Sequence, residues 1–396
     1  MELTAKQKEA VKIAVKRYRD GEKMIVISGY AGAGKSTVVS FIIAALDLDE
    51  MDVAYATFTG KAAQVLKDKG NPGATTLHKL LYYNTQMPNG TYIRTKRKEL
   101  GPKVIVVDEV SMVPSKMIQD LLSFPVYLIC CGDPGQLSPI AKDDNNHLLD
   151  HPHVFLDQIM RQAAESEIIQ VSMKVREGQE LEEFHGKEVQ IFENDDLTEG
   201  MLLWADAVLC ATNKKRLSYN NIIRQRLGYS DRLLVPGEKL IFLHNYDNMI
   251  SDSEEASLTN GTVGFAENIR EHEITLPYWL KKSESERIIA CYKIDLRLEN
   301  DDIIRDVIVE KKMLATGTSV LTGSDLYKLR KNKRFNTPLP NDATYGYAAT
   351  VWKYQGSSAK KVLLIEEGFP FDKEEHKKFM YTGITRAENK LVIIKK

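Results

Sequence analysis

The 396-residue sequence has little cysteine, almost no net charge and no long apolar run. Its four cysteines, Cys130, Cys131, Cys210 and Cys291, lie in apolar segments without CxxC spacing, so we expect reduced, buried thiols rather than disulfides or a zinc site. The formal net charge of −1 excludes a global attraction to polyanions and leaves any such binding to local basic patches. No apolar run reaches the roughly 20 residues that span a bilayer, and the N-terminal segment MELTAKQKEAV lacks the apolar core of a signal peptide. We therefore expect a cytoplasmic protein without a membrane partner.

Apolar runs alternate with helical patterns over the first 150 or so residues, in a chain long enough for two or three domains. The runs cover 24–28, 52–58, 103–110 and 126–133, and the helical patterns cover 4–19, the segments that begin at Lys35 and Lys61, and 114–122. Almost continuously apolar strands separated by helices predict a parallel sheet with helices on both faces. We therefore expect an α/β domain over residues 1–153.

Two segments interrupt this pattern. Between Leu81 and Pro102 a Pro-Asn-Gly turn flanked by β-formers predicts a hairpin inserted over residues 81–102. After a second α/β series begins near Leu156, residues 236–339 contain short β-rich pieces, which are typical of a small barrel or sandwich. The predicted organisation is a second α/β domain over 154–235 and 340–396, interrupted by a β-rich domain over 236–339.

The segment SGYAGAGKST, residues 28–37, matches the full P-loop pattern GxxxxGK[ST] between an apolar strand and a helix. Glycines let backbone N–H groups face phosphate oxygens, and the following helix N-terminus adds its dipole. Lys35 is expected to reach the β- and γ-phosphates, and the Ser36 hydroxyl is expected to bind Mg²⁺. The residues expected to contact ATP are Gly29, Ala31, Gly32, Ala33, Gly34, Lys35, Ser36 and Thr37.

Two further polar motifs follow apolar strands. In VIVVDEVSM, Asp108 is expected to hold Mg²⁺ through water, and Glu109 to orient or deprotonate the attacking water. In CGDPGQLSPI, Gln136 is placed to sense the γ-phosphate, although this segment could also be an ordinary Gly-Asp-Pro-Gly turn. The glutamate next to the aspartate favours ATP hydrolysis over phosphoryl transfer to a small molecule. The histidine-rich segment HLLDHPH fits no standard metal spacing, and we interpret it as a surface loop.

The order of these motifs resembles superfamily 1 helicases, and most closely their 5′-to-3′ RecD/Dda-like branch, from Gln7 to the C-terminus. The resemblance implies an α/β fold of two RecA-like parallel-sheet P-loop domains, with a β-hairpin inserted in the first and an SH3-like β-barrel in the second. It implies that Gln7 reads adenine, that Gly356 lies at the nucleotide, and that Arg161 and Arg386 are arginine fingers. It also implies contacts with DNA from Thr59, Gly60, Lys61, Thr76, His78, Thr212, Asn213, Thr350, Trp352 and Lys353.

The resemblance implies an ATP-dependent DNA helicase that moves 5′ to 3′ on single-stranded DNA and acts at junctions with duplex. Such a protein is expected to work as a monomer with ATP and Mg²⁺, alongside replication or recombination proteins. Met87 and Pro88 lie in the expected hairpin, where they would form a strand-separating pin. Trp352 departs from the family pattern, which usually has histidine at this position. Two alternatives remain: a superfamily 1 RNA helicase, and a translocase that remodels complexes without separating strands.

Overall fold

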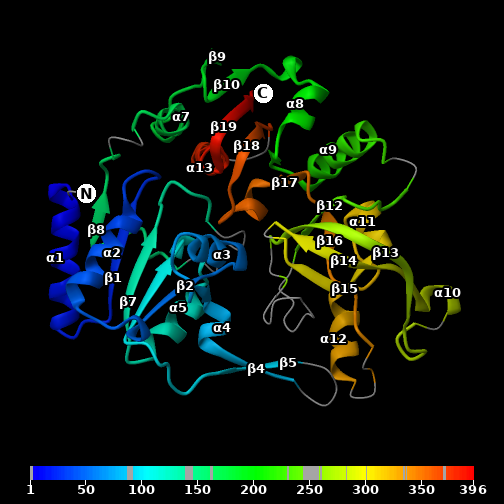
Figure 1. Ribbon diagram of the computed structural model, residues 1–396, viewed down its shortest axis with the longest axis horizontal. Helices are drawn as coiled ribbons and strands as arrows, with labels where there is room; N and C mark the ends of the chain where they lie inside the picture. The colour runs from blue at the N-terminus through cyan, green and yellow to red at the C-terminus, as the bar shows by residue number, and fades with distance from the viewer. Residues whose placement is uncertain are drawn as a thin grey trace.

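The computed structural model of the chain describes residues 3–86, 92–138, 146–160, 164–229, 232–243, 258, 261–281, 283–299, 301–332, 335, 337–368 and 372–396. Met87, Pro88 and Arg161 lie outside these residues, so their predicted roles stay predictions. The described residues form two six-stranded sheets and one five-stranded sheet, arranged side by side (Figure 1). None of the helices described is both long and apolar enough to cross a membrane. All four cysteines are buried and free, as the sequence predicted.

The first sheet is entirely parallel, with strand order β3-β2-β6-β7-β1-β8. Its strands are β1 (Met24–Gly29), β2 (Val53–Thr57), β3 (Thr75–Thr76), β6 (Val104–Asp108), β7 (Tyr127–Gly132) and β8 (Val154–Leu156). The predicted apolar runs coincide with β1, β2, β6 and β7 to within one to two residues at each end. We call this sheet and its helices the first unit.

Helices cover both faces of the first sheet. Ile25 and Ile27 of β1 pack in one core with α1 (Ala5–Arg19) and α2 (Lys35–Leu46). Val26, which points to the opposite face, packs in another core with α4 (Leu77–Leu81) and α5 (Ser115–Leu122). The 3₁₀ helices η1 (Glu50–Asp52) and η2 (Val110–Met112) and helix α3 (Gly60–Asp68) complete the unit. Burial on both faces explains why these strands lack polar alternation.

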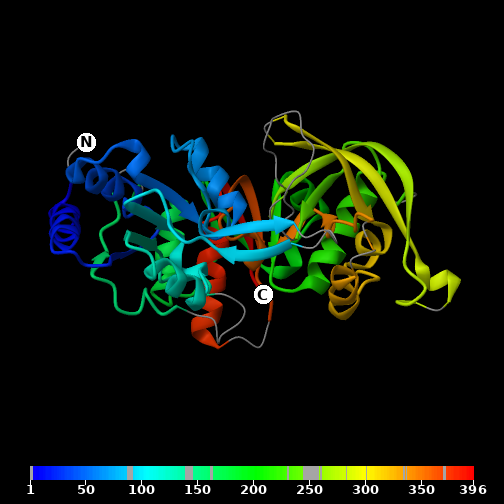
Figure 2. The same ribbon diagram turned by 90° about the horizontal axis from the view of Figure 1, so that it is seen from below.

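The expected hairpin is present as the antiparallel pair β4 (Tyr82–Gln86) and β5 (Tyr92–Lys96). Tyr82 is opposite Lys96, and the phenol of Tyr82 donates a hydrogen bond to Asp120 of α5 (2.7 Å). The hairpin extends from the first unit towards the β-rich part of the molecule (Figure 2).

The second sheet has strand order β17-β11-β18-β19-β10-β9 and is parallel except for β9. Its strands are β9 (Phe184–His185), β10 (Val189–Phe192), β11 (Ala207–Cys210), β17 (Ala348–Thr350), β18 (Ala359–Ile365) and β19 (Ala387–Ile394). One face packs on α7 (Glu167–Arg176) and α13 (Lys373–Ile384), and the other on α8 (Glu199–Trp204) and α9 (Asn213–Arg226). With η4 (Asn194–Asp196) and η5 (Val351–Tyr354), these elements form the second unit.

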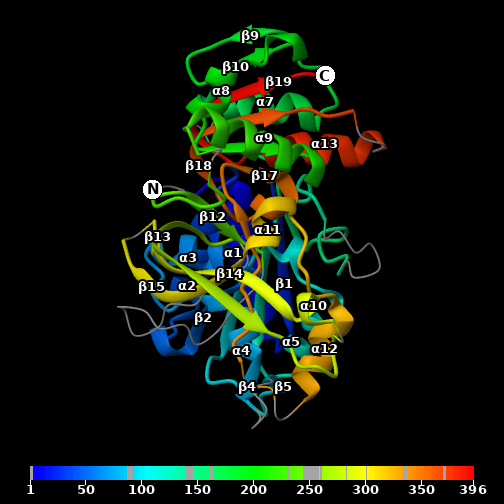
Figure 3. The same cartoon turned by 90° about the vertical axis from the view of Figure 1, so that its right-hand side faces the viewer.

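The third sheet is antiparallel, with order β15-β14-β13-β12-β16, and we call it the β-rich unit (Figure 3). Its strands are β12 (Lys239–Phe242), β13 (Val263–Thr275), β14 (Ile288–Leu298), β15 (Ile303–Glu310) and β16 (Ala343–Tyr345), joined by α10 (Glu284–Arg287), α11 (Lys311–Thr316) and α12 (Gly323–Lys331). A bridge between Val309 and Asn341 brings β15 next to the chain that enters β16. The two edges of the sheet therefore meet, as a small barrel requires. This sheet includes β16, which lies beyond the expected boundary at residue 339.

Candidate active site

The P-loop connects β1 to α2 at the carboxyl edge of the first sheet. Gly32 and Gly34 have φ values of 77° and 78°, a left-handed backbone that glycine adopts without strain. The ammonium group of Lys35 donates hydrogen bonds to the carbonyl oxygens of Gly29 (2.6 Å) and Tyr30 (3.1 Å). The lysine therefore curls over the concave side of the loop, where a phosphate would lie.

Helix α1 brings Gln7 to this loop. Thr4 and Gln7 form a capping box at the helix start, in which the Gln7 side chain accepts from the Thr4 backbone N–H (3.0 Å). The Gln7 amide nitrogen donates to the carbonyl of Ala33 (3.2 Å). A Cβ atom on Gly34 would lie 2.6 Å from that nitrogen, so only glycine allows this approach. The predicted adenine-reading residue is thus fixed against the P-loop.

The two acidic residues after β6 have unusual environments. Glu109 has φ 52° and ψ 44°, a left-handed conformation that is uncommon for a non-glycine residue and is often found at functional sites. Asp108 accepts a hydrogen bond from the Glu109 backbone N–H (2.9 Å). Burial, and secondly the charge of Glu109, raises the pKa of Asp108 to about 6, while the positive charge of Lys35 opposes this shift. In the described part of the chain neither carboxylate has an ion-pair partner.

The chemistry of this acidic pair fits a divalent cation, which prefers carboxylate oxygen ligands. Within the described ranges, no cluster of three or more His, Cys, Asp and Glu side chains could hold a metal by itself. A Mg²⁺ ion here would depend on Asp108, on the Ser36 hydroxyl at the start of α2 and on nucleotide phosphates, which is the usual way proteins bind this ion. When bound, Mg²⁺ would neutralise charge on the phosphates.

Residues after β7 form the third wall of the site. Gln136 is 6% exposed, and its Oε1 is buried without a hydrogen-bond partner in the described structure. Asp133 is buried, accepts a hydrogen bond from the Gly135 N–H (2.9 Å), and has its pKa raised by burial. Gln136 therefore has an unused acceptor at the position where the sequence predicts a γ-phosphate sensor.

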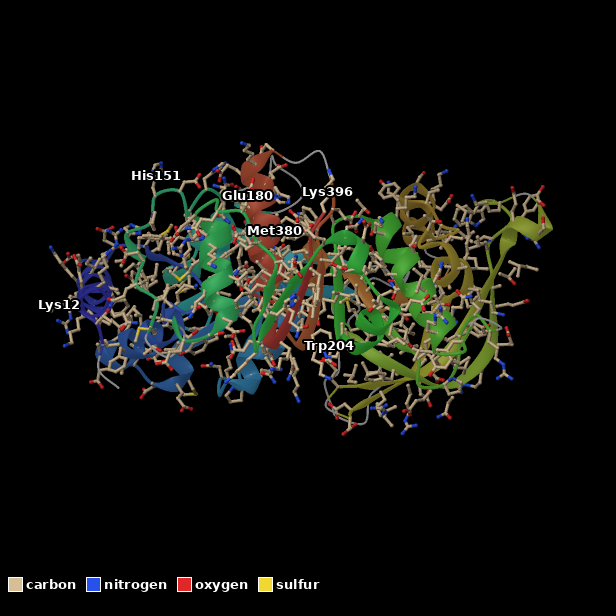
Figure 4. All side chains as sticks on the ribbon, turned by 90° about the horizontal axis from the view of Figure 1, so that it is seen from above. Lys12, His151, Glu180, Trp204, Met380 and Lys396 are labelled. Carbon is tan, nitrogen blue, oxygen red and sulfur yellow. The ribbon has the colours of Figure 1, made fainter. Side chains whose placement is uncertain are left out.

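The second unit contacts this site directly through α13. The Tyr381 hydroxyl accepts a hydrogen bond from the Ala31 N–H of the P-loop (2.8 Å) and donates one to Asp133 (2.7 Å). The next residue, Thr382, accepts from the Leu137 N–H (2.9 Å) through its hydroxyl. In Figure 4, Met380 of the same helix lies near the middle of the molecule, with Lys12 of α1 at one end. The P-loop therefore lies at the junction of the two units.

Two more second-unit residues complete this junction. Gln355 donates a side-chain hydrogen bond to the Leu137 carbonyl (2.7 Å). The Arg176 guanidinium of α7 stacks 3.7 Å from the ring centre of Tyr30, and its Nη1 is buried without a hydrogen-bond partner among the residues described. Neither Arg176 nor Tyr381 was predicted from the sequence to lie at this site. Tyr381 precedes the predicted arginine finger by five positions and belongs to the same sequence motif, which was a signal for it. No motif in the sequence contains Arg176.

Arg386, the predicted arginine finger, lies just after α13, and its side chain forms hydrogen bonds within the second unit. It is buried, and it donates hydrogen bonds to the carbonyls of Thr382 (3.0 Å) and Ser357 (3.3 Å) and to the Thr385 hydroxyl (3.1 Å). Contact with a γ-phosphate would require these bonds to exchange. Its role as a finger stays a prediction.

Three of the predicted DNA-contacting threonines share one local structure. Thr59, Thr76 and Thr212 are the N-caps of α3, α4 and α9, and each hydroxyl accepts from a backbone N–H of its helix (3.3 Å in each case). Helix N-termini present free N–H groups that suit phosphate oxygens. At α9 the Glu367 carboxylate accepts hydrogen bonds from the Ala211 N–H (2.8 Å) and the Thr212 hydroxyl (2.9 Å), so a phosphate there would have to displace it. Contact of these threonines with DNA stays a prediction.

The remaining predicted contacts lie around these helix starts. Gly60 and Asn213 are the first residues of α3 and α9, and His78 lies in α4 with its ring 5.6 Å from that of Phe58. Thr350 is buried at the N-cap of η5, and burial lowers the pKa of Lys353 in that turn. The Trp352 ring packs against Phe379 (5.8 Å between centres), so in this structure it stacks inside the second unit.

Gly356 lies against α3 rather than at the P-loop. Its φ is 74°, and a Cβ atom there would lie 3.0 Å from Ala62 and 3.1 Å from the Thr59 hydroxyl. The structure therefore groups Gly356 with the predicted DNA contacts. A nucleotide contact by Gly356 stays a prediction.

Comparison with known proteins gives matches at both ends of the chain. A family model described as an AAA domain matches residues 2–195, and one described as a UvrD-like helicase C-terminal domain matches residues 345–394. The ATP-dependent DNA helicase dda of Enterobacteria phage T4 is 28% identical over 270 residues, which are 61% of this chain and 61% of that protein. The ATP-dependent RecD2 DNA helicase of Deinococcus radiodurans is 32% identical over 167 residues, which are 40% of this chain and 22% of that protein. The match therefore spans about three fifths of the first relative and about a fifth of the second.

Solved structures extend the likeness to the whole fold. A Bacteroides Pif1 helicase in complex with ADP-AlF3 and ssDNA superposes with a TM-score of 0.53, covering 99% of this chain and 92% of that chain at 17% identity. A structure of two Pif1 helicases on forked dsDNA gives the same TM-score at 18% identity. These matches confirm the expected α/β fold class and agree with two RecA-like domains.

Proposed function

Because the chain belongs to the superfamily 1 helicases of the Pif1/RecD/Dda-like group, we propose that it hydrolyses ATP to move 5′ to 3′ on single-stranded DNA and to separate duplex DNA. The observation that carries this proposal is the hydrogen bond from the Ala31 N–H of the P-loop to the Tyr381 hydroxyl of the second unit. A nucleotide in the P-loop would lie where the two units touch. Binding and hydrolysis can then change how the units pack.

The chemistry is assigned to residues on both sides of this junction. Lys35 binds the β- and γ-phosphates, and Asp108 with Ser36 holds Mg²⁺. Glu109 orients the attacking water, and Gln136 donates a side-chain amide N–H to the γ-phosphate, while its unpaired Oε1 is available to accept from the attacking water. Arg386, together with Arg161, neutralises charge that develops on the phosphate. Arginine fingers in other NTPases raise turnover by about 10³–10⁵.

The DNA strand is assigned to the starts of α3, α4 and α9. Thr59 and Thr76 belong to the first unit and Thr212 to the second, so one strand that contacts all three spans both units. A change in the packing of the units then changes the spacing between phosphate contacts. We propose that the protein steps along the strand in this way as a monomer, and that the β4–β5 hairpin with Met87 and Pro88 divides the duplex.

Lys35→Ala tests the ATPase assignment. The variant is expected to lose ATP hydrolysis while it keeps binding of a single-stranded oligonucleotide, measured by fluorescence anisotropy. Hydrolysis at the wild-type rate in this variant would overturn the proposal.

A streptavidin-displacement assay tests the direction of movement. Oligonucleotides biotinylated at either end are incubated with protein and ATP, and displacement only from the 3′ end is the expected result. Displacement only from the 5′ end would show movement in the 3′-to-5′ direction and would contradict the proposed polarity. Displacement without unwinding of a forked duplex would identify a translocase, and activity on RNA alone would identify an RNA helicase.

A further inference from the structure

The Tyr381 hydroxyl forms one hydrogen bond to each of two walls of the ATP site. It accepts from the Ala31 N–H in the P-loop (2.8 Å) and donates to the Asp133 carboxylate (2.7 Å), which precedes Gln136 in the loop after β7. Tyr381 is 1% exposed and Asp133 is 1% exposed, so the hydroxyl and its carboxylate acceptor are shielded from water. A single oxygen of the second unit thus connects two loops of the first unit.

The neighbouring residues hold this hydroxyl in place. Asp133 is oriented by the Gly135 N–H, and a Cβ atom on Gly135 would lie 3.0 Å from the Tyr381 ring. Tyr30 and Ala31 of the P-loop pack against the core of the second unit, beside Tyr381. The contact between the two units is therefore closely packed around the hydroxyl.

Two features indicate that this link responds to nucleotide. The amide that it uses belongs to a loop whose N–H groups otherwise face phosphate oxygens. Arg386 lies five positions after Tyr381, just beyond the end of α13, and its guanidinium donates to the carbonyl of Thr382, the residue next to Tyr381 (3.0 Å). A short chain of contacts therefore connects the Ala31 amide to the arginine.

We propose that Tyr381 is a positioning residue that couples the phosphate state of the P-loop to the placement of Arg386 and to the grip on DNA. The hydroxyl holds α13 against the P-loop and against Asp133. Phosphates in the loop compete for the Ala31 amide, so the hydrogen bond changes when γ-phosphate enters and leaves. This inference rests on the proposed ATP hydrolysis, and Tyr381 itself makes no contact with the reacting atoms.

Tyr381→Phe removes both hydrogen bonds and keeps the ring. The kcat of DNA-stimulated ATP hydrolysis is expected to fall by about tenfold or more, with the KM for ATP changed by less than about threefold, because hydrogen bonds to charged groups are strong. The dissociation constant of a single-stranded oligonucleotide is measured with ADP and with a non-hydrolysable ATP analogue. The ratio of the two constants is expected to move towards one, since coupling between two ligands is reciprocal.

A structural test uses the protein without nucleotide. Hydrogen exchange of the peptide that contains Ala31 is expected to be faster in Tyr381→Phe than in the wild type, because its amide loses its acceptor. This measurement does not depend on activity. If the wild type fails to hydrolyse ATP, the proposed function falls while exchange still tests the link. If the wild type hydrolyses ATP and exchange is unchanged in the variant, the inference alone falls.

Tyr127→Phe is the matched control. Its hydroxyl is buried and donates to the Ala14 carbonyl (3.0 Å), away from the P-loop. It is expected to lose a similar amount of thermal stability and to keep kcat and the ratio of DNA affinities. Asp133→Asn, which replaces the charged acceptor, is expected to shift the ratio in the same direction as Tyr381→Phe by a smaller factor. Equal effects of Tyr127→Phe and Tyr381→Phe, or a wild-type ratio in Tyr381→Phe, would overturn the inference.

Discussion

The ammonium group of Lys61 forms an ion pair with the carboxylate of Glu299. Lys61 lies in the first turn of α3, and Glu299 directly follows β14, so the pair joins the first unit to the β-rich unit. A Cβ atom on Gly261 would lie 3.8 Å from the backbone carbonyl oxygen of Lys353 and 3.9 Å from the Cβ of Lys61, so two predicted DNA contacts lie close to this glycine. The Glu299 carboxylate thus pairs with a lysine that the sequence predicts to contact DNA.

Glu299→Gln should strengthen binding to single-stranded DNA. A phosphate would no longer displace a carboxylate from Lys61, and one negative charge would leave the binding surface. Exposed ion pairs contribute about 0.2–1 kcal/mol, so the dissociation constant should fall by a factor of about 1.4 to 5 at low salt. Fluorescence anisotropy with an oligothymidine at several salt concentrations measures this.

Glu286→Gln controls for the change in net charge. Glu286 is exposed in α10 of the same β-rich unit, and its replacement removes the same charge without touching Lys61. Equal gains of affinity in the two variants would mean that the ion pair itself has no role. The gain from Glu299→Gln should also shrink as salt rises, because screening weakens both the pair and the phosphate contact.

Asp108→Asn should stabilise the nucleotide-free protein while it abolishes hydrolysis. Burial and Glu109 raise the pKa of Asp108 to about 6, so the folded state binds this proton more tightly than the unfolded state does. The ionised carboxylate therefore lowers the free energy of unfolding. This penalty is absent below pH 4 or so, grows as the pH rises to about 6, and is then constant at about 2–3 kcal/mol.

Thermal or urea unfolding at several pH values tests this. The stabilisation by Asp108→Asn should be largest at pH 7.5 and fall to about half at pH 5. A wild type that is more stable than the variant at pH 7.5 without nucleotide would contradict the raised pKa. With Mg²⁺ and ATP present, the order should reverse, because ligands that bind the folded wild type stabilise it.

Arg176→Lys should slow ATP hydrolysis although it keeps the positive charge. Lysine cannot reproduce the planar stacking of the guanidinium on Tyr30, which links α7 to the P-loop. Cation–π contacts of this kind contribute about 0.5–1 kcal/mol, so kcat/KM should fall by about two- to fivefold. Lys174→Ala, an exposed change in the same helix, should leave steady-state ATPase kinetics unchanged. Matching kinetics for Arg176→Lys and the wild type would exclude a role for the stack.

The sequence predicted those features that local chemistry determines. The P-loop glycines, the apolar strands that end at Gly29 and Asp108, and the strands of the β4–β5 hairpin are each specified by adjacent residues. Contacts between the units were less predictable, because they depend on packing between segments distant in the chain. The hydrogen bond between Ala31 and Tyr381 joins residues 350 positions apart, and no local pattern marks it.

Dependence on packing also explains why Gly356 and Trp352 have protein contacts that were not predicted from the sequence. The motif that contains them was recognisable, but the neighbours of each residue depend on how η5 packs. Gly356 lies against α3, and Trp352 packs on Phe379 of α13. The sequence motif thus identified the segment, and the packing of the segment determines which residues Gly356 and Trp352 contact.

Gly135→Ala should reproduce the effect of Tyr381→Phe without altering the tyrosine. The new methyl group would lie 3.0 Å from Cε1 and 3.2 Å from Cδ1 of the Tyr381 ring, closer than real Cβ contacts usually are, so the ring must move. Because the core around it is closely packed, that movement stretches the bonds to Ala31 and Asp133. The kcat for ATP should fall, and hydrogen exchange of the P-loop peptide should rise. Gly73→Ala adds the same methyl group where no atom lies within 4 Å, and it should change neither measurement. A Gly135→Ala protein with wild-type kcat and exchange would show that the P-loop does not depend on the placement of Tyr381.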